Sequence, residues 1–239
     1  MGKKVVAVDG PAASGKSAVC RMAAERLGWA HFSSGLFYRL VAWLVLREME
    51  KEGESWEKVV SALKEGEAER VEITVDLNKI LEMMEEVQLH KEGVELLPKW
   101  RGEVIGELEL HRVEVSKLTP VFAKIPWLRQ EITELIRRKV PDRCFIDGRD
   151  VGTNIFPDAC LKLFLTASAE ERARRRAKQI GEDYKKILEE IKRRDELDQK
   201  RAVDPLKPAE DAQVIDTTNM GIDEVVQEVV ELVEKKCIR

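Results

Sequence analysis

The sequence predicts an α/β fold with a mainly parallel sheet. Short apolar runs, typical of buried strands, alternate along the chain with longer segments whose apolar residues recur at helical spacing. The first run, residues 5–8, is continuously apolar, as expected for a strand covered on both faces, and a glycine-rich turn and a helical segment follow it. A chain of 239 residues, 44% of them hydrophobic, is long enough to bury the core of such a fold.

The remaining elements follow the same alternation. Apolar spacing predicts a helix that ends at Gly28, a glycine suited to a C-cap, and a second helix over residues 36–50. In the C-terminal half we expect, in order, a helix over 128–136, strands at 143–146 and 161–165, a basic helix from 168, a helix from 187 that is stopped by Pro205 and Pro208, a short strand at 213–215 and a closing helix over 222–233.

Residues 51–117 differ from the rest of the chain, because the charge rises there and the apolar pattern weakens. Residues 71–75 alternate like an exposed strand, and residues 87–96 predict a hairpin that turns at Lys91-Glu92-Gly93. We interpret this segment as a small α+β insertion within one domain that spans residues 1–239.

The bulk composition excludes several classes of function. The 41 basic and 45 acidic side chains nearly cancel, to a net charge of −4, which argues against nucleic-acid or membrane-surface binding driven by net charge. No apolar run approaches 18 residues and the first is too short for a signal peptide, so we expect a cytoplasmic protein. The cysteines lack a CxxC pair, which predicts reduced thiols rather than metal ligands or disulfides for Cys20, Cys144, Cys160 and Cys237.

One motif indicates the chemistry. "GPAASGKS" matches the P-loop pattern G-x-x-x-x-G-K-[ST] and lies between a predicted strand and a predicted helix, as that pattern requires. Backbone N–H groups of such a loop cradle phosphates, the lysine reaches the β- and γ-phosphates, and the serine hydroxyl binds Mg²⁺. The predicted triphosphate-binding residues are Gly10, Pro11, Ala12, Ala13, Ser14, Gly15, Lys16, Ser17 and Ala18.

A P-loop leaves two classes open: a switch or motor that transfers phosphate to water, and a kinase that transfers it to a second substrate. The sequence has no GTPase-type N-K-x-D run, whereas a kinase needs a second basic site near the γ-phosphate. Candidates exist. Beyond Ile187 and Ile191 the apolar stripe of one helix continues, on the same face, as Arg194, Asp198 and Arg201.

This polar stripe has two interpretations. A charge run on a helix is usually a solvated surface, but a stripe that changes from apolar to Arg-Asp-Arg without changing face favours a helix over an anion-filled cleft. Two further sets of cations could face the same anion: Arg39, which follows an N-cap-like "SSG", and the cluster of Arg172, Arg175 and Arg176.

The stretch "FIDGRDVG" places three charges at the end of a predicted strand. In parallel sheets, ligands bind at the carboxyl ends of the strands. We expect Asp147, nearest the sheet, to face Mg²⁺ and the P-loop, with a purely structural hydrogen-bonding role as the alternative. Arg149 is expected to hold a phosphate of the second substrate and Asp150 its base.

The motifs "DGPAASGKS", "SSGLFYR", "FIDGRDVGTNIFPDA", "SAEERARRR" and "RRDELDQKRAVDPL" together resemble those of bacterial-type cytidylate kinases, in the same order and spacing. The resemblance covers residues 4–48 and 126–235 closely and 51–117 loosely. It implies a P-loop kinase fold with a five-stranded parallel sheet, a monophosphate-binding insert at 51–117 and a mobile lid at 168–203. The implied reaction is transfer of the ATP γ-phosphate to CMP or dCMP, with Mg²⁺, in a monomer that binds neither nucleic acid nor membrane.

The resemblance also implies roles for single residues. The CMP phosphate is expected to contact Ser34, Arg39, Arg149 and Arg201; the cytosine is expected to contact Ser116, Arg129 and Asp150; and the pentose is expected to contact Arg194 and Asp198. In the lid, Arg172, Arg175 and Arg176 are expected to hold ATP and the transferring phosphate, with Lys16, Arg149 and Arg201 completing the catalytic set and Ser17 and Asp147 on the metal.

The sequence departs from the family pattern in the insert, where residues 105–110 read "IGELEL" and lack the arginine of the family's "I-R-x-x-E-V" run. Two alternatives therefore stay open: a monophosphate kinase with relaxed choice between UMP and CMP, and a P-loop NTPase switch.

Overall fold

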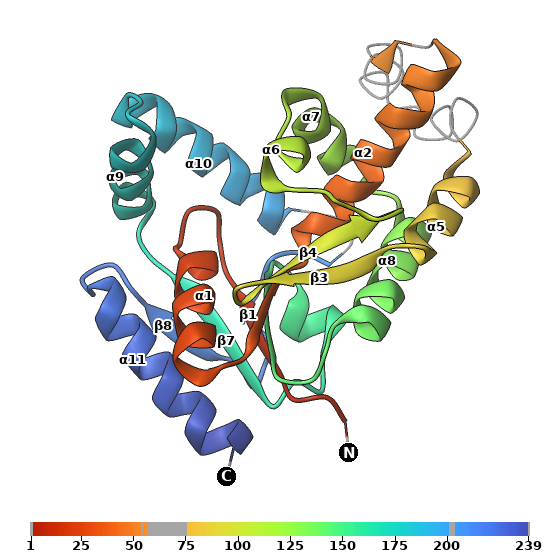
Figure 1. Cartoon of the computed structure of the whole chain (residues 1–239). Coiled ribbons are helices and arrows are strands. Elements are labelled where there is room, and N and C mark those ends of the chain that lie inside the picture. Colours follow the sequence, from red (N-terminus) through yellow and green to blue (C-terminus); the bar gives the residue numbers. More distant parts are fainter. Residues whose placement is uncertain (1, 54, 57–75, 201–203, 239) are drawn as a thin grey trace. The chain divides into compact units, whose positions relative to one another are not determined.

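The computed structural model in Figure 1 describes residues 2–53, 55–56, 76–200 and 204–238. The predicted strand at 71–75 lies outside these ranges. The chain divides into two compact units: unit 1 contains residues 1–33, 93–95 and 140–239, and unit 2 contains residues 34–92 and 96–139. Each unit is described by itself below. The proposed limits of the insert and the lid stay predictions.

Unit 1 is built on a five-stranded parallel sheet with the strand order β2-β6-β1-β7-β8. Its strands are β1 (Val5–Asp9), β2 (Ala30–Ser33), β6 (Cys144–Gly148), β7 (Leu161–Thr166) and β8 (Gln213–Asp216). The predicted parallel sheet is confirmed, and the short strand β2 was not predicted. Because β1 lies at the centre and all five strands run the same way, their carboxyl ends meet at one edge of the sheet.

The helices of unit 1 agree with the sequence patterns. They are α1 (Lys16–Leu27), α9 (Ala169–Ile180), α10 (Tyr184–Gln199) and α11 (Ile222–Val233), with π-helical turns at Val151–Ile155 and Glu234–Ile238. The predicted C-cap of α1 is confirmed, since Gly28 has a φ of 66° and its N–H bonds to the last turn of the helix. None of the helices in the described ranges is long and apolar enough to cross a membrane.

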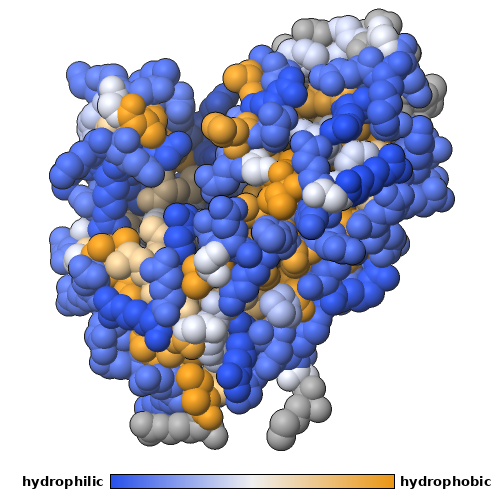
Figure 2. All heavy atoms as spheres, in the orientation of Figure 1, coloured by the Kyte–Doolittle hydropathy of each residue, from blue (hydrophilic) through white to orange (hydrophobic). Residues whose placement is uncertain are grey.

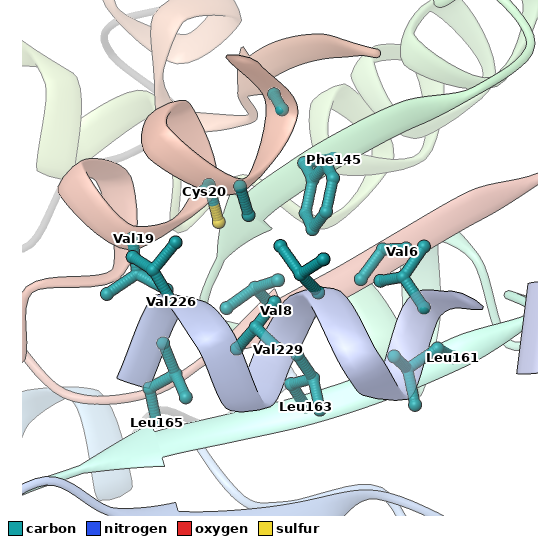
Figure 3. Packing of buried hydrophobic residues seen from close by; sticks show 14 of the residues in the cluster. Val6, Val8, Val19, Cys20, Phe145, Leu161, Leu163, Leu165, Val226 and Val229 are labelled. Atoms are coloured by element: carbon teal, nitrogen blue, oxygen red, sulfur yellow. The ribbon is translucent and has the colours of Figure 1, made fainter. Parts of the chain in front are cut away.

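A buried apolar cluster fixes β1 and α1 on either side of the P-loop. Figure 3 shows Val6 and Val8 of β1 packed among side chains of α1, β6, β7 and α11. Val226 and Val229 of α11 are at most 1% exposed and lie in the same cluster. Each fully buried side chain of this size contributes about 1.5–3 kcal/mol of hydrophobic stabilisation. The segment between β1 and α1 therefore starts and ends in rigid structure.

Helices α9 and α10 lie side by side as a hairpin in unit 1 (Figure 1). Each begins with a side-chain cap, since Ser168 accepts the N–H of Glu171 and Asp183 accepts that of Lys186. The surface over this hairpin is largely hydrophilic in Figure 2. In the described residues, the buried apolar cluster of this hairpin is small. It consists of Ala173, Ile187 and Ile191, with a few partly buried neighbours. The hairpin is therefore held to a large extent by polar contacts.

Unit 2 contains the long, largely buried helix α2 and the elements of the insert. Its helices are α2 (Gly35–Glu52), α5 (Leu77–Glu85), α6 (Glu107–Leu110), α7 (Val113–Phe122) and α8 (Pro126–Lys139), and its strands are β3 (Gln88–Glu92), β4 (Glu95–Trp100, whose first residue belongs to unit 1) and β5 (Glu103–Val104). The hairpin predicted at 87–96 is confirmed as β3 and β4, with Gly93 at a φ of 61° in the turn.

The prediction of four reduced cysteines is wrong for two of them. Cys160 and Cys237 form a disulfide with a Cα–Cα distance of 5.4 Å, whereas Cys20 and Cys144 are buried thiols outside any disulfide. The bond joins the segment before β7 to the C-terminal π-helical turn. A separation of 77 residues hid this pairing, because only the packing of α11 on the sheet brings the two cysteines together.

Candidate functional site

The P-loop connects β1 to α1 at the centre of the sheet edge. Its backbone has the left-handed conformations that the motif predicts, with φ values of 150° at Gly10, 58° at Ala13 and 87° at Gly15. At Gly10 a side chain is also excluded by space, because a Cβ atom would lie 2.0 Å from the carbonyl oxygen of Leu165 in β7. This strand end therefore requires glycine, and it places the loop against the neighbouring strand.

Lys16 is buried in the first turn of α1 and folds back over the loop. Its Nζ donates to the carbonyl oxygens of Gly10 (2.8 Å) and Pro11 (2.7 Å) and lies 3.3 Å from the hydroxyl of Ser14. Burial, followed by the nearby charge of Arg149, lowers the pKa of Lys16 to about 7. An anion bound in the loop would favour the protonated ammonium and raise this pKa.

Ser17 and Asp147 meet below the loop, as the prediction of a shared metal site requires. The Ser17 hydroxyl donates to Asp147 Oδ2, and His31 Nε2 lies 3.5 Å from the same oxygen. Burial raises the pKa of Asp147, but the neighbouring His31 and the hydroxyls of Ser17 and Ser33 outweigh it and hold the pKa at about 2. The carboxylate is ionised at neutral pH.

These two oxygen donors fit Mg²⁺. That ion prefers hard oxygen ligands, and in phosphate-binding sites it is usually held by one or two protein oxygens together with the phosphates and water. In the described part of the chain no group of three or more His, Cys, Asp and Glu side chains could hold a metal ion. Ser17 and Asp147 stay the predicted ligand pair.

Arg149 and Asp150 follow β6 at the same sheet edge. Arg149 donates from Nε to Asp198 Oδ2 (2.8 Å) and from a terminal nitrogen to the carbonyl oxygen of Gly10 (3.1 Å). Its guanidinium thus links the P-loop to α10. Asp150 is 5% exposed, and the side-chain amide of Asn154 donates to its Oδ2 at 3.2 Å. The two charges of "GRD" therefore point to different partners, as expected from their separate predicted roles.

Asp9, which was not among the predicted site residues, holds the backbone after Asp150. Its two carboxylate oxygens accept the N–H groups of Val151 (2.8 Å) and Gly152 (2.7 Å). Burial raises the pKa of Asp9 to about 6, against the opposing effect of these two hydrogen bonds.

The three predicted arginines of α9 have different surroundings. Arg172 is 4% exposed and forms a two-pronged ion pair with Asp195 of α10, while its guanidinium also donates to the carbonyl oxygens of Ala12 and Ala167. Arg175 bonds to Thr217 and Glu171, and Arg176 lies at the surface beside Gln179. Only Arg172 contacts the P-loop itself.

On α10 the polar part of the predicted stripe stays a prediction, because its described members differ in their surroundings. Ile187, Ile191 and Asp198 are buried, and Arg194 is exposed. Asp198 contacts Arg149, so the polar continuation of the stripe faces a cation at the sheet edge. Arg201 lies outside the described residues.

In unit 2, four of the predicted CMP ligands lie on or beside α2. Ser34 is the buried N-cap residue of α2, and Arg39 donates to the hydroxyl of Ser116 (3.1 Å) and to the carbonyl oxygen of Leu110. Arg129 is 3% exposed, donates to the carbonyl oxygen of Ala123 and stacks 5.5 Å from the ring centre of Tyr38. The structure thus brings Ser116 to Arg39, while their expected roles toward CMP stay predictions.

The chain matches the model of one protein family, described as cytidylate kinase, over residues 6–235. It is 38% identical to a cytidylate kinase of Shouchella clausii over 96% of both chains, and 36% identical to a cytidylate kinase of Caldicellulosiruptor saccharolyticus over 98% of this chain and 97% of that one. The chain belongs to the cytidylate kinase family. It is thus a nucleoside-monophosphate kinase, and its parallel α/β fold is that of a P-loop kinase.

Among solved structures, an uncharacterised protein of Eubacterium ventriosum aligns with a TM-score of 0.50 and 12% identity over 97% of this chain and 99% of the other. This likeness concerns the fold alone.

Membership in the cytidylate kinase family gives the contacts around the P-loop a chemical meaning, and several of their residues were missed in the sequence. His31, Asn154, Asp195 and Thr217 each contact a predicted site residue, and Asp9 holds the backbone directly after the predicted residue Asp150. Asp9 alone had a local signal, because it directly precedes Gly10 in "VAVDGPAASGKS". Asn154 lies in the same motif as its partner Asp150, but its residue type gave no signal of the contact, and His31, Asp195 and Thr217 were hidden because their partners are distant in the sequence.

Proposed function

We propose that this chain transfers the γ-phosphate of ATP to CMP or dCMP, giving ADP and CDP or dCDP. The observation that carries the proposal is the meeting of two sets of groups at the carboxyl edge of the unit 1 sheet. One set is the P-loop with Lys16 and the Ser17–Asp147 pair, and the other is Arg149 and Asp150 at the end of β6. A triphosphate site beside a cation–carboxylate pair suits transfer between two nucleotides.

The P-loop side holds ATP. Its N–H groups and the start of α1 attract the phosphates, and Lys16 exchanges its carbonyl contacts for the β- and γ-phosphates. When bound through Ser17 and Asp147, Mg²⁺ supplies neutralisation of charge on the phosphate oxygens. Arg172 and Arg175 fix α9 against Ala12 and Thr217, and Arg176 completes the lid side. Phosphoryl transfer needs alignment and charge neutralisation more than covalent help, so these positions suffice for the donor side.

For the monophosphate we propose the roles that the family resemblance implies. Ser34, Arg39, Arg149 and Arg201 hold its phosphate, Arg194 and Asp198 its pentose, and Ser116, Arg129 and Asp150 its base. Asp150 carries the base preference, because a carboxylate accepts the N4 amine of cytosine, whereas uracil presents a carbonyl oxygen there.

The test is a coupled assay that separates transfer from hydrolysis. With ATP, Mg²⁺ and CMP we expect ADP and CDP in equal amounts, and little ADP when CMP is left out. ADP formation at the same rate with and without CMP, and without CDP, would show an NTPase instead. A cytoplasmic location and a monomeric state complete the proposal, and size-exclusion chromatography with light scattering measures the latter.

A further inference from the structure

Asp9 is the last residue of β1. It lies next to both parts of the proposed site, the P-loop and the end of β6. The next residue along the chain, Gly10, opens the P-loop. In the sheet Asp9 pairs with Gly148 of β6 on one side and with Phe164 of β7 on the other. It is 4% exposed, and no predicted role in phosphate or base binding falls on it.

The side chain of Asp9 contacts the backbone that follows the base-reading residue. One oxygen accepts the N–H of Val151 at 2.8 Å and the other that of Gly152 at 2.7 Å, and both contacts are buried. These are the first two residues of a π-helical turn that starts directly after Asp150. Two charge-assisted bonds to consecutive amides fix both the position and the rotation of that turn.

Space around Gly152 is limited in the same direction. A Cβ atom at this residue would lie 3.4 Å from Asp9 Oδ2 and 3.3 Å from Cγ and Cδ of Lys162, whose ammonium is paired with Asp211. The turn is therefore held by the carboxylate and closed in by the lysine stem, and glycine lets the backbone approach both. A shift of the carboxylate would leave two buried N–H groups without acceptors.

The same residue is linked to Arg149 through the main chain. Arg149 donates to the carbonyl oxygen of Gly10 at 3.1 Å, and Lys16 donates to that oxygen at 2.8 Å. The residue directly after Asp9 thus carries the carbonyl oxygen that accepts hydrogen bonds from both cations. The side chain of Asp9 holds the segment that follows Arg149 and Asp150.

We propose that Asp9 is a positioning residue that holds the turn after Asp150 in register with the P-loop, and so sets the placement of Arg149 and Asp150 for CMP. This inference rests on the proposed function, which supplies the roles of the two residues it positions. Asp9 itself touches neither the phosphates nor the base.

A carboxylate at position 9 lowers the stability of the fold at neutral pH, and this supports a functional reason for the presence of Asp9. Burial raises the pKa of Asp9 to about 6, so its ionised form destabilises the folded chain at neutral pH. Residues that lower stability while supporting a site are typical of functional positions.

The variant Asp9→Asn tests the proposal, with Val8→Ala as the matched control. Asparagine keeps the size of the side chain and one acceptor oxygen but presents an NH₂ group to one of the two amides. Val8 is the preceding residue of the same strand, 1% exposed, and packs in the apolar cluster instead. Both variants are compared at a temperature at which circular dichroism shows them folded.

For Asp9→Asn we expect a rise of about 10-fold or more in KM for CMP and a loss of about 10- to 100-fold in kcat/KM, as for one or two lost charged hydrogen bonds. KM for ATP is expected to change less than about 3-fold, and the CMP preference over UMP to fall. Val8→Ala is expected to lower stability and leave both KM values near those of the wild type. Equal changes in the two KM values, no change in either, or the same pattern in Val8→Ala would each overturn the proposal.

Hydrogen exchange separates failure of this proposal from failure of the proposed function. If the wild type forms no CDP, the proposed function is wrong, but the amides of Val151 and Gly152 still report on Asp9. We expect their exchange to be at least about 10-fold faster in Asp9→Asn than in Val8→Ala. Unchanged exchange at both amides would refute the positioning role, whatever the activity.

Discussion

The buried carboxylate of Asp9 makes the free energy of unfolding depend on pH in a window set by two pKa values. In the unfolded chain its pKa is the ordinary 3.8, and in the folded chain it is raised to about 6. Between these values the folded chain keeps a proton on Asp9 that the unfolded chain has released. Stability from this group is therefore fully present below pH 3.8 and is lost as the pH rises through 6.

The size of the effect follows from the width of the window. A shift of about two pKa units corresponds to about 3 kcal/mol, since one unit is worth about 1.4 kcal/mol. Asparagine carries no charge at any pH, so Asp9→Asn lacks this contribution. The difference in unfolding free energy, variant minus wild type, should accordingly rise by about 2 kcal/mol of this total between pH 4 and pH 7.

Urea unfolding of both chains at a series of pH values measures this difference. The other titrating groups are common to both chains and largely cancel, although Asp150 and Lys16 act on Asp9 by charge and are included in its raised pKa. Val8→Ala provides the control, because its free energy of unfolding should differ from that of the wild type by an amount that does not vary with pH. If the unfolding free energy of Asp9→Asn minus that of the wild type is constant over the same range, or falls as the pH rises, the raised pKa does not belong to this carboxyl group.

Three further predictions concern other parts of unit 1. In Gly10→Ala the new Cβ would lie 2.0 Å from the carbonyl oxygen of Leu165, so we expect a loss of more than about 100-fold in kcat/KM for ATP. The control Gly106→Ala, where a Cβ meets open space, should leave kcat/KM nearly unchanged, and equal effects of the two substitutions would contradict the steric argument. Asp150→Asn should lower the ratio of kcat/KM for CMP to that for UMP by about 10-fold or more, whereas Arg149→Ala should lower kcat/KM for CMP and UMP by similar factors. If Asp150→Asn lowers both kcat/KM values by the same factor, Asp150 does not recognise the base. Reduction of the disulfide should lower the free energy of unfolding by about 4 kcal/mol, because it closes a loop of 77 residues, and denaturation that is unaffected by reductant would show that the bond does not form.

The features that could be predicted from the sequence are those encoded locally. The P-loop lies within eight consecutive residues, and its strand, turn and helix each have their own signal, so its geometry followed directly. The α10 stripe was readable because helical spacing puts Ile191 and Asp198 on one face, and the contact of Asp198 with Arg149 agrees with that interpretation.

The insert was only partly predictable, since its elements are short and its pattern is weak. The hairpin β3–β4 had a glycine at its turn and was found. Helix α6 has four residues, and α7 contains Pro120, which ordinarily argues against a helix interior. Such segments are stabilised by packing on α2 more than by their own propensity.

Pairings between distant residues could not be predicted at all. Asp9 meets Val151 across 142 positions, Arg172 meets Asp195 across 23, and the two bonded cysteines are 77 apart. Each depends on the strand order of the finished sheet or on helix packing, for which no local pattern exists. The resemblance to a family supplied expected roles in substrate binding, and the residues that contact those predicted residues became visible only in the structure.

The most direct test of the central claim, that this member of the cytidylate kinase family phosphorylates CMP or dCMP, is kcat/KM with ATP and Mg²⁺ for CMP, dCMP, UMP and AMP in parallel. We expect CMP or dCMP to exceed UMP and AMP by about 100-fold or more, since Asp150 would be left facing a carbonyl oxygen in uracil and since the two-ring adenine differs from cytosine in size. Values for UMP or AMP within about 10-fold of that for CMP would contradict this account of the site.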